Sequence, residues 1–257
     1  MNKLLNKFAI GIMVIVLFGC ASAPKVTEEI EIIEPPTTEE LNDQHRANLE
    51  QINLHDVVMT TSEKFDAGNK LSQKTETSLG NFVSDAQVAY LKDIGVEVDF
   101  ALTNGGNIRS SLPKGDVTKK NILTTVPYKT YIYVLDLNGS DVIELFNYIG
   151  SLPQVSSGWA QVSAQVSYTI TYTNEKGSVS NVLINGLPID ETKNYKIAVN
   201  NYLANGGEGY TMLANATSVF DSTMLMSDVV LWYATTLPPL AEPKINKRIT
   251  IIGGIDL

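Results

Sequence analysis

The spacing of apolar and polar residues predicts a series of short strands and helices that begins near residue 53. The run "LHDVVMTTSEKF" predicts a strand, because its apolar residues cluster ahead of small polar ones. The segment "TSLGNFVSDAQVAYLKDIG" carries apolar residues at helical spacing and predicts a helix that Gly95 ends. A short strand follows in "VEVDFALTNGG", which ends in a glycine pair.

The rest of the chain continues this alternation. The pattern predicts strands in "YIYVLDL", "YKIAVNNYL" and "KRITIIGG", and helices in "SDVVLWYATTL" and in "GSDVIELFNYIG", with Ser140 as the N-cap. The run "AQVSAQVSYTITYT" predicts one half-buried strand, which "NEKGS" turns back into "VSNVLIN" as a hairpin. Interleaved strands, helices and a hairpin indicate a mixed α/β or α+β fold in one domain, residues 53–257.

The first twenty residues, "MNKLLNKFAIGIMVIVLFGC", have the layout of an export signal. Lys3 and Lys7 precede an apolar run that is too short to span a bilayer comfortably. The run ends in Cys20, the single cysteine of the chain, and "LFGC" resembles a bacterial lipobox, in which the cysteine is lipidated after cleavage. We expect a signal peptide at 1–19 and an exported, lipid-anchored protein on the periplasmic or cell-surface side of a bacterial membrane. The alternative is an uncleaved anchor with an incidental cysteine.

Residues 20–52 differ from both neighbouring segments, because Pro, Thr and Glu dominate and no apolar face is sustained. This composition predicts a flexible tether between the membrane and the domain. The short run "EIEII" leaves a first edge strand open as an alternative.

Composition limits the possible partners. The 257 residues are 44% hydrophobic and 18% charged, which is enough apolar content for a real core. The formal net charge of -9 excludes a nucleic-acid backbone as the ligand, since phosphate binding of that kind needs clustered Lys and Arg. The chain has only three arginines, Arg46, Arg109 and Arg248, so the position of each one is informative.

The stretch "NNYLANGGEGY", residues 200–210, sets Tyr202 and Tyr210 around a turn that contains Asn205, three glycines and Glu208. Glycines allow positive φ angles and the close approach of another group to the main chain. Taken alone, the stretch fits either a shaped binding turn or a simple strand-to-helix corner.

Three segments together carry a family resemblance: "ETSLGNFVSDA" (76–86), "TNGGNIR" (103–109) and "NNYLANGGEGY" (200–210). Their order and spacing resemble those of the C-terminal, substrate-recognising domain of the 5'-nucleotidase family. "LTTVPYKTYIYVLDLNGSDVIELF" and "GWAQVS" fill the same places between them, so the resemblance covers roughly residues 53–252. It implies a layered α/β/β/α fold.

The resemblance also implies a role for each matched position. Asn104 and Arg109 would contact the nucleoside part of a ligand and its phosphates. Trp159 and Tyr202 would stack on the two faces of the base, and Glu208, in place of an Asp, would accept hydrogen bonds from ribose hydroxyls. Stacking suits a base that is flat and apolar on both faces. The alternatives are core packing for the two aromatic residues and a surface ion pair for Arg109.

Three departures from the family pattern bear on phosphate. Gln73, with Lys74 beside it, stands where the family usually has an arginine, and neither side chain reproduces a guanidinium fork. Asn107 replaces a glycine, and Glu208 is longer than the usual Asp. We therefore expect recognition of base and ribose to be retained and recognition of phosphate to be weakened.

The sequence predicts no catalytic residues, metal ligands or cofactor in this chain. The full-length enzymes that it resembles use two metal ions held by a separate metallophosphatase domain, which is rich in His, Asp and Asn. This chain has only His45 and His55, no Gly-x-Ser-x-Gly elbow and no P-loop. Divalent metals are expected only on a partner metallophosphatase.

Three functions remain open at this point. The chain is the substrate-binding half of a split 5'-nucleotidase in nucleotide catabolism, a non-catalytic lipoprotein that captures nucleosides, or a degenerate domain with a closed pocket. The ligand in the first two is a nucleoside or nucleotide. We favour the split enzyme, in which a separate metallophosphatase subunit supplies the chemistry.

Overall fold

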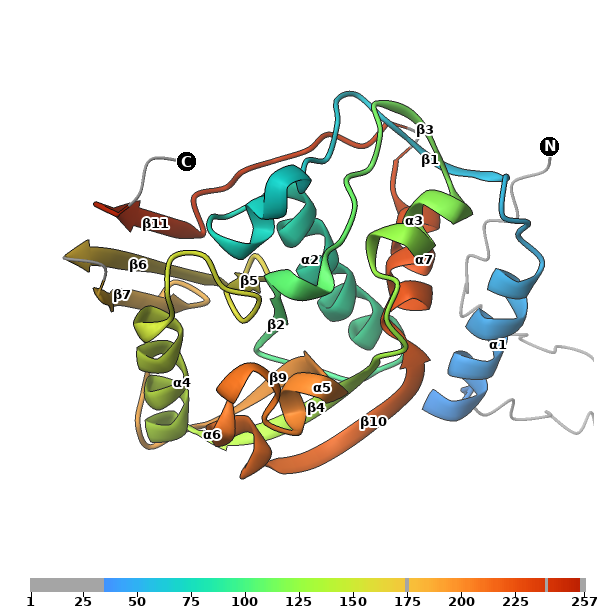
Figure 1. Cartoon of the computed structure of the whole chain (residues 1–257). Helices are drawn as coiled ribbons and strands as arrows, with labels where there is room; N and C mark the ends of the chain where they lie inside the picture. Colours follow the sequence, from blue (N-terminus) through green and yellow to red (C-terminus); the bar gives the residue numbers. More distant parts are fainter. Residues whose placement is uncertain (1–34, 174–175, 239, 255–257) are drawn as a thin grey trace, which may run out of the picture. The chain divides into compact units, whose positions relative to one another are not determined.

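The computed structural model describes residues 35–173, 176–238 and 240–254, and the residues from Pro36 onward form one compact unit (Figure 1). The predicted signal peptide, Cys20 and the "EIEII" run lie outside the described residues. Within the described part, no helix combines the length and the apolar character needed to cross a membrane.

The described residues form helices and strands in the mixed order that the sequence predicted, so the fold class is confirmed. The helices are α1 (Thr38–Glu50), α2 (Ser78–Asp93), α3 (Lys119–Thr125), α4 (Gly139–Ser151), α5 (Asn201–Ala204), α6 (Thr211–Ala214) and α7 (Met226–Thr236). The strands are β1 (Val57–Thr61), β2 (Phe100–Asn104), β3 (Gly115–Thr118), β4 (Tyr131–Asn138), β5 (Ala160–Val162), β6 (Val166–Thr173), β7 (Lys176–Ile184), β8 (Leu187–Pro188), β9 (Asn194–Asn200), β10 (Thr217–Leu225) and β11 (Ile249–Ile252).

A five-stranded sheet in the order β10-β4-β9-β2-β5 separates two apolar cores. Side chains alternate between its faces, as pleated strands require. On β4, for example, Ile132 and Val134 face the core under α2 and α7, whereas Leu135 and Leu137 face the core that α4 covers. Both faces of this strand are therefore buried, which explains why most positions of "YIYVLDL" are apolar.

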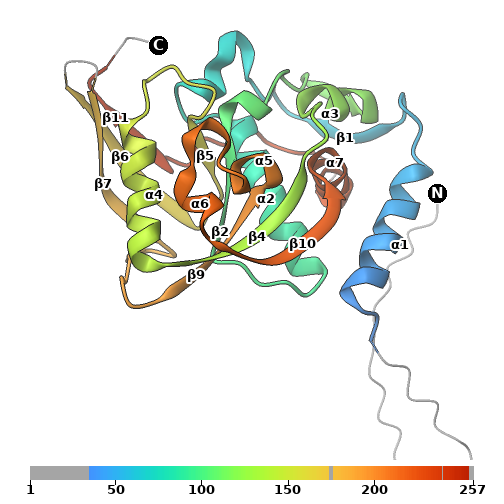
Figure 2. The ribbon, with the colours of Figure 1, turned by 60° about the horizontal axis from the view of Figure 1, so that its bottom comes forward.

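A second sheet in the order β11-β6-β7-β8 packs against α4, which contacts β7 (Figure 1). In Figure 2, the short helices α5 and α6 lie over β4 and β9, at the end of β9 where the glycine-rich turn begins. The strand β11 pairs in parallel with β6, and the irregular residues 240–248, here called the strap, connect α7 to β11.

Part of the predicted tether is a helix that belongs to the domain. Thr37 and Glu40 cap α1 reciprocally, because each side chain accepts a hydrogen bond from the backbone N–H of the other residue. Asn42 is buried, accepts a hydrogen bond from the Tyr90 hydroxyl and donates to the Ser222 carbonyl. The boundary at residue 53 was therefore wrong, and the compact unit begins near Pro36.

Two local predictions were also wrong. The N-cap of α4 is Asn138, whose Oδ1 accepts a hydrogen bond from the Asp141 N–H, and Ser140 already lies inside the helix. The run predicted as one strand divides into β5 and β6, which belong to different sheets. The break is at Ser163, which exchanges hydrogen bonds with the backbone of Ala101 and thereby ends β5.

Candidate functional site

The segment "TNGGNIR" forms a tight turn at the end of the central strand β2. A Cβ on Gly105 would come within 2.0 Å of the Ser72 carbonyl oxygen, so only glycine fits there. Asn104 is buried, donates from Nδ2 to the Ser157 carbonyl and accepts at Oδ1 from Asn200. The turn therefore brings the Asn104 amide and the following residues to one edge of the sheet.

The glycine-rich stretch forms a second turn after β9. Asn200 caps α5, and Gly206, Glu208 and Gly209 all have positive φ angles, of 82°, 56° and 85°. A Cβ on Gly207 would come within 2.6 Å of the Tyr202 ring, so the glycine allows the turn to fold against that ring. A side chain such as Glu208 rarely adopts this left-handed conformation, and its presence here marks a constrained residue.

The loop before β5 joins the two turns. The Ser157 hydroxyl donates to Glu208 Oε2 at 2.6 Å, and the Tyr202 hydroxyl donates to Glu208 Oε1 at 3.3 Å. The Ser157 carbonyl accepts from the Gly106 N–H at 2.8 Å. Ser157 is therefore bonded to both glycine-rich segments, although they lie about a hundred positions apart in the chain.

A cavity of about 340 Å³ opens between these segments, and we call it the tyrosine cavity. Its lining residues are Asn104, Gly106, Asn107, Arg109, Tyr128, Thr130, Ser157, Asn200, Tyr202 and Glu208. Tyr128 is 48% exposed and Tyr202 is 47% exposed, so both rings offer surface to a ligand. Arg109 is exposed and forms no ion pair with the residues that the structure describes.

Two further tyrosines support the floor of this site. Burial raises the pKa of Tyr210 well above its usual value, and its hydroxyl donates to the Gly158 carbonyl at 2.7 Å. Partial burial and, to a lesser extent, the Glu208 carboxylate raise the pKa of Tyr148, whose hydroxyl donates to the Glu208 carbonyl. Both phenols remain protonated at neutral pH and can therefore hold the loop and the turn in place.

Four of the five residues predicted to bind a ligand line this one cavity: Asn104, Arg109, Tyr202 and Glu208. Trp159 does not, which corrects its predicted position. Its side chain is 0% exposed, packs in the core that α4 covers, and directs Nε1 toward the Tyr172 hydroxyl at 3.4 Å. Trp159 lies between the buried residues Gly158 and Ala160 at the start of β5, so the ring enters the core.

Tyr128 is the aromatic lining residue that the sequence reasoning missed. It lies in the loop between α3 and β4, within the quoted segment "LTTVPYKTYIYVLDLNGSDVIELF". A tyrosine directly after Val126 and Pro127 in a loop was the available signal, since a proline before a strand favours an exposed turn. The structure makes Tyr128 the second exposed aromatic ring of the cavity, alongside Tyr202.

The departures from the family pattern also have structural positions. Gln73 is 6% exposed and does not line the tyrosine cavity, while its carbonyl accepts from the Ser156 N–H. Asn107 does line the cavity, but its Nδ2 is sealed from solvent and has no partner among the described residues. Arg109 is therefore the one cationic side chain among the lining residues that the structure describes.

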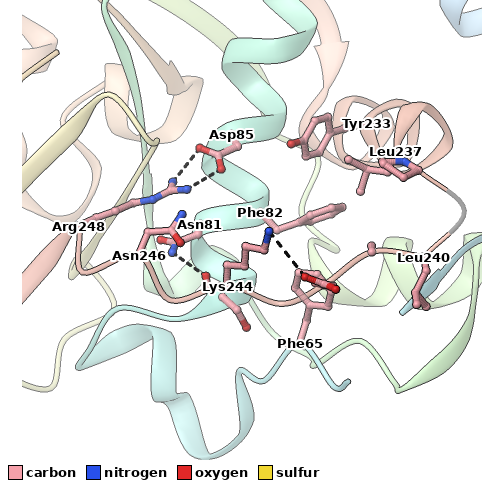
Figure 3. Close-up of a pocket in the computed structure, with 14 residues that line it drawn as sticks. Phe65, Asn81, Phe82, Asp85, Tyr233, Leu237, Leu240, Lys244, Asn246 and Arg248 are labelled. Atoms are coloured by element: carbon pink, nitrogen blue, oxygen red, sulfur yellow. Dashed lines mark hydrogen bonds and ion pairs between the residues drawn. The ribbon is translucent and has the colours of Figure 1, made fainter. Parts of the chain in front are cut away.

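A second cavity of about 290 Å³ lies under the strap, and Figure 3 shows it. We call it the strap cavity, lined mainly by α2, the end of α7 and the strap. Arg248 is 4% exposed and forms two hydrogen bonds of 2.7 Å with the Asp85 carboxylate. Asn81 donates from Nδ2 to the Lys244 carbonyl, and at the rim Lys244 Nζ lies 3.7 Å from Glu242 (Figure 3). The charged groups of this cavity thus pair with one another.

Glu76 is buried next to the strap cavity, and its carboxylate is likewise hydrogen-bonded to other groups of the protein. Its carboxylate accepts hydrogen bonds from Asn81 Nδ2 and from the backbone N–H groups of Asn246 and Ile249. Asn81 Oδ1 and Arg248 Nε have no partner among the described residues, but neither atom is accessible from the cavity. The polar groups here hold the strap on α2, and the tyrosine cavity is the candidate binding site.

Among the described residues, no group of three or more His, Cys, Asp and Glu side chains could hold a metal ion. His45 lies 2.8 Å from Asp93 and packs against Trp232, which places it at the contact of α1 with the domain. The described residues thus do not fit the two metal ions of the full-length enzymes, and we derive no step through a metal.

Comparison with known proteins gives consistent results. A family model described as "5'-nucleotidase, C-terminal domain" matches residues 57–215. The chain is 30% identical over 222 residues to the trifunctional nucleotide phosphoesterase protein YfkN of Bacillus subtilis, covering 84% of this chain and 15% of that protein. It is 30% identical over 183 residues to a 5'-nucleotidase of Vibrio vulnificus, covering 70% of this chain and 31% of the relative.

A solved structure supports the same fold. The 5'-nucleotidase precursor of Thermus thermophilus superposes with a TM-score of 0.71 at 24% identity, over 82% of this chain and 42% of that one. The chain therefore spans less than half of that structure and less than a third of the two curated relatives.

Proposed function

Since the chain belongs to the 5'-nucleotidase C-terminal domain family, we propose that it binds a nucleoside or nucleotide in the tyrosine cavity, as the substrate-binding half of a split 5'-nucleotidase. The observation that carries the proposal is the convergence, on one cavity, of two exposed tyrosine rings, a restrained carboxylate and an arginine that forms no ion pair with any described residue. Each group matches one part of a nucleotide.

The base binds against Tyr128 and Tyr202. A nucleobase presents flat apolar faces, and stacking on an aromatic side chain contributes about 1 to 3 kcal/mol per base. Covering an exposed ring with a base removes apolar surface of both partners from water, which is favourable. The Asn104 amide, which is fixed by Ser157 and Asn200, retains hydrogen-bonding capacity for the base edge.

The sugar and phosphate bind at the other polar groups. Glu208 accepts hydrogen bonds from the ribose hydroxyls, since a carboxylate has free acceptor sites beyond those that Ser157 and Tyr202 use. Arg109 contacts the phosphate, because a guanidinium without an ion pair binds oxyanions by charge-assisted hydrogen bonds. Gln73 makes no contact with the phosphate, so the cavity binds phosphate more weakly than a site with two arginines would.

A separate metallophosphatase completes the enzyme in this proposal. The relatives named above are much longer than the region that matches this chain. The described residues contain no group of three or more metal-binding side chains, and in this proposal a metallophosphatase on a separate polypeptide supplies the catalysis. Lipidation at Cys20 would hold the binding half at the outer side of a bacterial membrane, where extracytoplasmic nucleotides are met.

A second function is favoured by the charge of the cavity, since Arg109 is its one cationic side chain among the described lining residues. A lipoprotein that captures uncharged nucleosides needs base and ribose contacts but no strong phosphate site, and the buried position of Gln73 agrees with that. The two functions share the cavity and differ in whether a catalytic partner exists.

Calorimetric titration of the full-length chain with adenosine and AMP tests the shared part. We expect binding in the wild type and a loss of about tenfold or more in Tyr202→Ala and in Tyr128→Ala. Tyr131→Ala is the matched control, because Tyr131 is also exposed but does not line the cavity. Unchanged affinity in both cavity variants would refute the stacking site.

Native co-purification distinguishes the two functions. Tagged chain is recovered from cells that make it, and phosphate release from AMP is measured in the recovered fraction with and without chelator. Chelator-sensitive hydrolysis that Tyr202→Ala abolishes supports the split enzyme. A fraction that binds adenosine but releases no phosphate supports nucleoside capture.

A further inference from the structure

Glu208 is held from three separate segments of the chain. Its backbone has φ 56° and ψ 17°, and its carbonyl accepts a hydrogen bond from the Tyr148 hydroxyl. One carboxylate oxygen accepts from Ser157 at 2.6 Å and the other accepts from Tyr202 at 3.3 Å. The distances make the Ser157 bond strong and the Tyr202 bond weak.

Ser157 is itself anchored on its main-chain side. Its carbonyl accepts from the Gly106 N–H at 2.8 Å and from Asn104 Nδ2 at 3.1 Å. A Cβ on Gly106 would come within 2.9 Å of the Ser157 Cβ, so the loop and the turn are in close contact. These contacts hold the main chain of Ser157 in place. The Ser157 hydroxyl therefore holds the Glu208 carboxylate in a defined position.

A count of acceptor sites shows what this arrangement leaves free. Each carboxylate oxygen can accept about two hydrogen bonds. Oε2 uses one site on Ser157 and Oε1 uses one on Tyr202, so each oxygen keeps one site. Two adjacent hydroxyls fill these two sites, one on each oxygen, whereas a sugar with a single hydroxyl there leaves one site empty.

A free glutamate side chain would not hold both sites ready at once. Its three rotatable bonds give it one of the larger conformational entropies, which ordering must overcome. The hydrogen bond from Ser157 orders the side chain before the ligand arrives, and preorganisation of this kind raises affinity without adding a contact to the ligand.

We propose that Ser157 is a positioning residue: by holding the Glu208 carboxylate, it makes the tyrosine cavity selective for ribosides over 2'-deoxyribosides. This inference rests on the proposed function, because it assumes that a nucleoside occupies the cavity. Ser157 acts through Glu208 and needs no contact with the ligand.

The test compares adenosine with 2'-deoxyadenosine by calorimetry on the full-length chain. We expect the wild type to prefer adenosine by about tenfold, the size of one hydrogen bond to a charged group. Ser157→Ala should reduce the preference to about threefold or less, mainly through weaker adenosine binding. Ser157→Thr keeps the hydroxyl and should restore the preference.

Ser156→Ala is the matched control. The Ser156 hydroxyl accepts from the Gly158 N–H at 3.1 Å and so belongs to the same loop, but the structure shows no hydrogen bond between the side chains of Ser156 and Glu208. An equal fall in selectivity in Ser156→Ala would overturn the inference, since loop loosening would then explain the effect. Unchanged selectivity in Ser157→Ala would overturn it as well.

The result for the wild-type chain distinguishes failure of the proposed function from failure of the inference about Ser157. If it binds neither nucleoside, the proposed function fails and the inference fails with it. If it binds adenosine with a preference that Ser157→Ala leaves intact, the proposed function stands and only the role of Ser157 is refuted.

Discussion

The strap cavity and the tyrosine cavity have similar volumes, about 290 and 340 Å³, but they use their polar groups in opposite ways. In the strap cavity, Arg248 and Asp85 form hydrogen bonds with each other, and the nearby Glu76 carboxylate accepts a hydrogen bond from the backbone N–H of Asn246. In the tyrosine cavity, Arg109 has no ion pair within the described part, and two tyrosine rings are about half exposed. The two cavities therefore differ less in size than in how many of their polar and aromatic groups are exposed, and this difference makes the tyrosine cavity the candidate binding site.

The same contrast predicts where mutations act. Groups that satisfy one another inside the protein contribute to its stability, and groups left exposed in a cavity contribute to binding. Substitutions in the strap cavity should lower the free energy of unfolding and leave ligand affinity unchanged. Substitutions in the tyrosine cavity should do the reverse.

The largest expected effect comes from Asp85→Ala. Removing this carboxylate leaves the Arg248 guanidinium, which is 4% exposed, without its counter-ion. Breaking a buried pair in this way typically costs about 3 to 5 kcal/mol. Urea denaturation of the full-length chain should show a loss of that size, while the Kd for adenosine in the folded fraction stays within about twofold of the wild type. A large loss of affinity for adenosine at unchanged stability would contradict the comparison, because the strap cavity would then contribute to binding.

Trp159→Phe should give the next largest effect. The smaller ring leaves a void in a fully buried site and removes the hydrogen bond to Tyr172, so we expect a loss of about 1 to 3 kcal/mol in unfolding free energy. Thermal and urea unfolding measure this loss, and titration with adenosine should give an unchanged Kd. A tenfold weaker affinity for adenosine with normal stability would instead support the predicted role of Trp159 in ligand binding.

Arg109→Ala should act on binding and only for charged ligands. Loss of one charge-assisted hydrogen bond lowers the affinity for AMP by about tenfold, and the affinity for adenosine should not change. Lys129→Ala is the matched control, since Lys129 is an exposed cation next to Tyr128 that does not line the cavity. Raising the salt concentration should weaken AMP binding in the wild type more than in Arg109→Ala. Equal losses for AMP and adenosine would show that Arg109 supports the base or sugar instead.

Lys244→Ala should give the smallest effect. Its ammonium lies 3.7 Å from Glu242, and both side chains are more than 60% exposed, so the pair contributes at most about 0.5 kcal/mol. The Lys244 carbonyl, which accepts from Asn81, is unaffected by the substitution. Urea denaturation should therefore be nearly unchanged. A loss comparable to that of Asp85→Ala would mean that the rim, rather than the buried pair, holds the strap.

Much of the fold follows from local patterns in the sequence. Strands β4 and β9 and helices α2 and α7 lie where the periodicity predicted them, because each buries regularly spaced apolar residues. Helix α1 was missed although "TTEE" contains its capping box at Thr37 and Glu40. The other residues of α1 are mostly polar and exposed, and no local pattern reveals that Asn42 is buried and hydrogen-bonded to distant residues.

The candidate site also contains residues that could be predicted from the sequence and residues that could not. Asn104, Arg109, Tyr202 and Glu208 could be placed together because the segments that carry them resemble the family pattern, and all four line one cavity. The choice between Trp159 and Tyr128 could not be made from sequence, since both are aromatic residues beside a loop. Only the packing of β5 against the core decides that Trp159 is inside and Tyr128 is exposed.

The pairing of Arg248 with Asp85 also fixes an order of events during synthesis. The two residues are 163 positions apart, so α2 is made long before the arginine that neutralises it. Helix α7, which packs on α2, and the strap are likewise translated late. Because α7 packs on α2 and the strap pairs with it, α2 cannot be fully covered until residues 226–248 have been made, so the compact unit completes its fold late in synthesis.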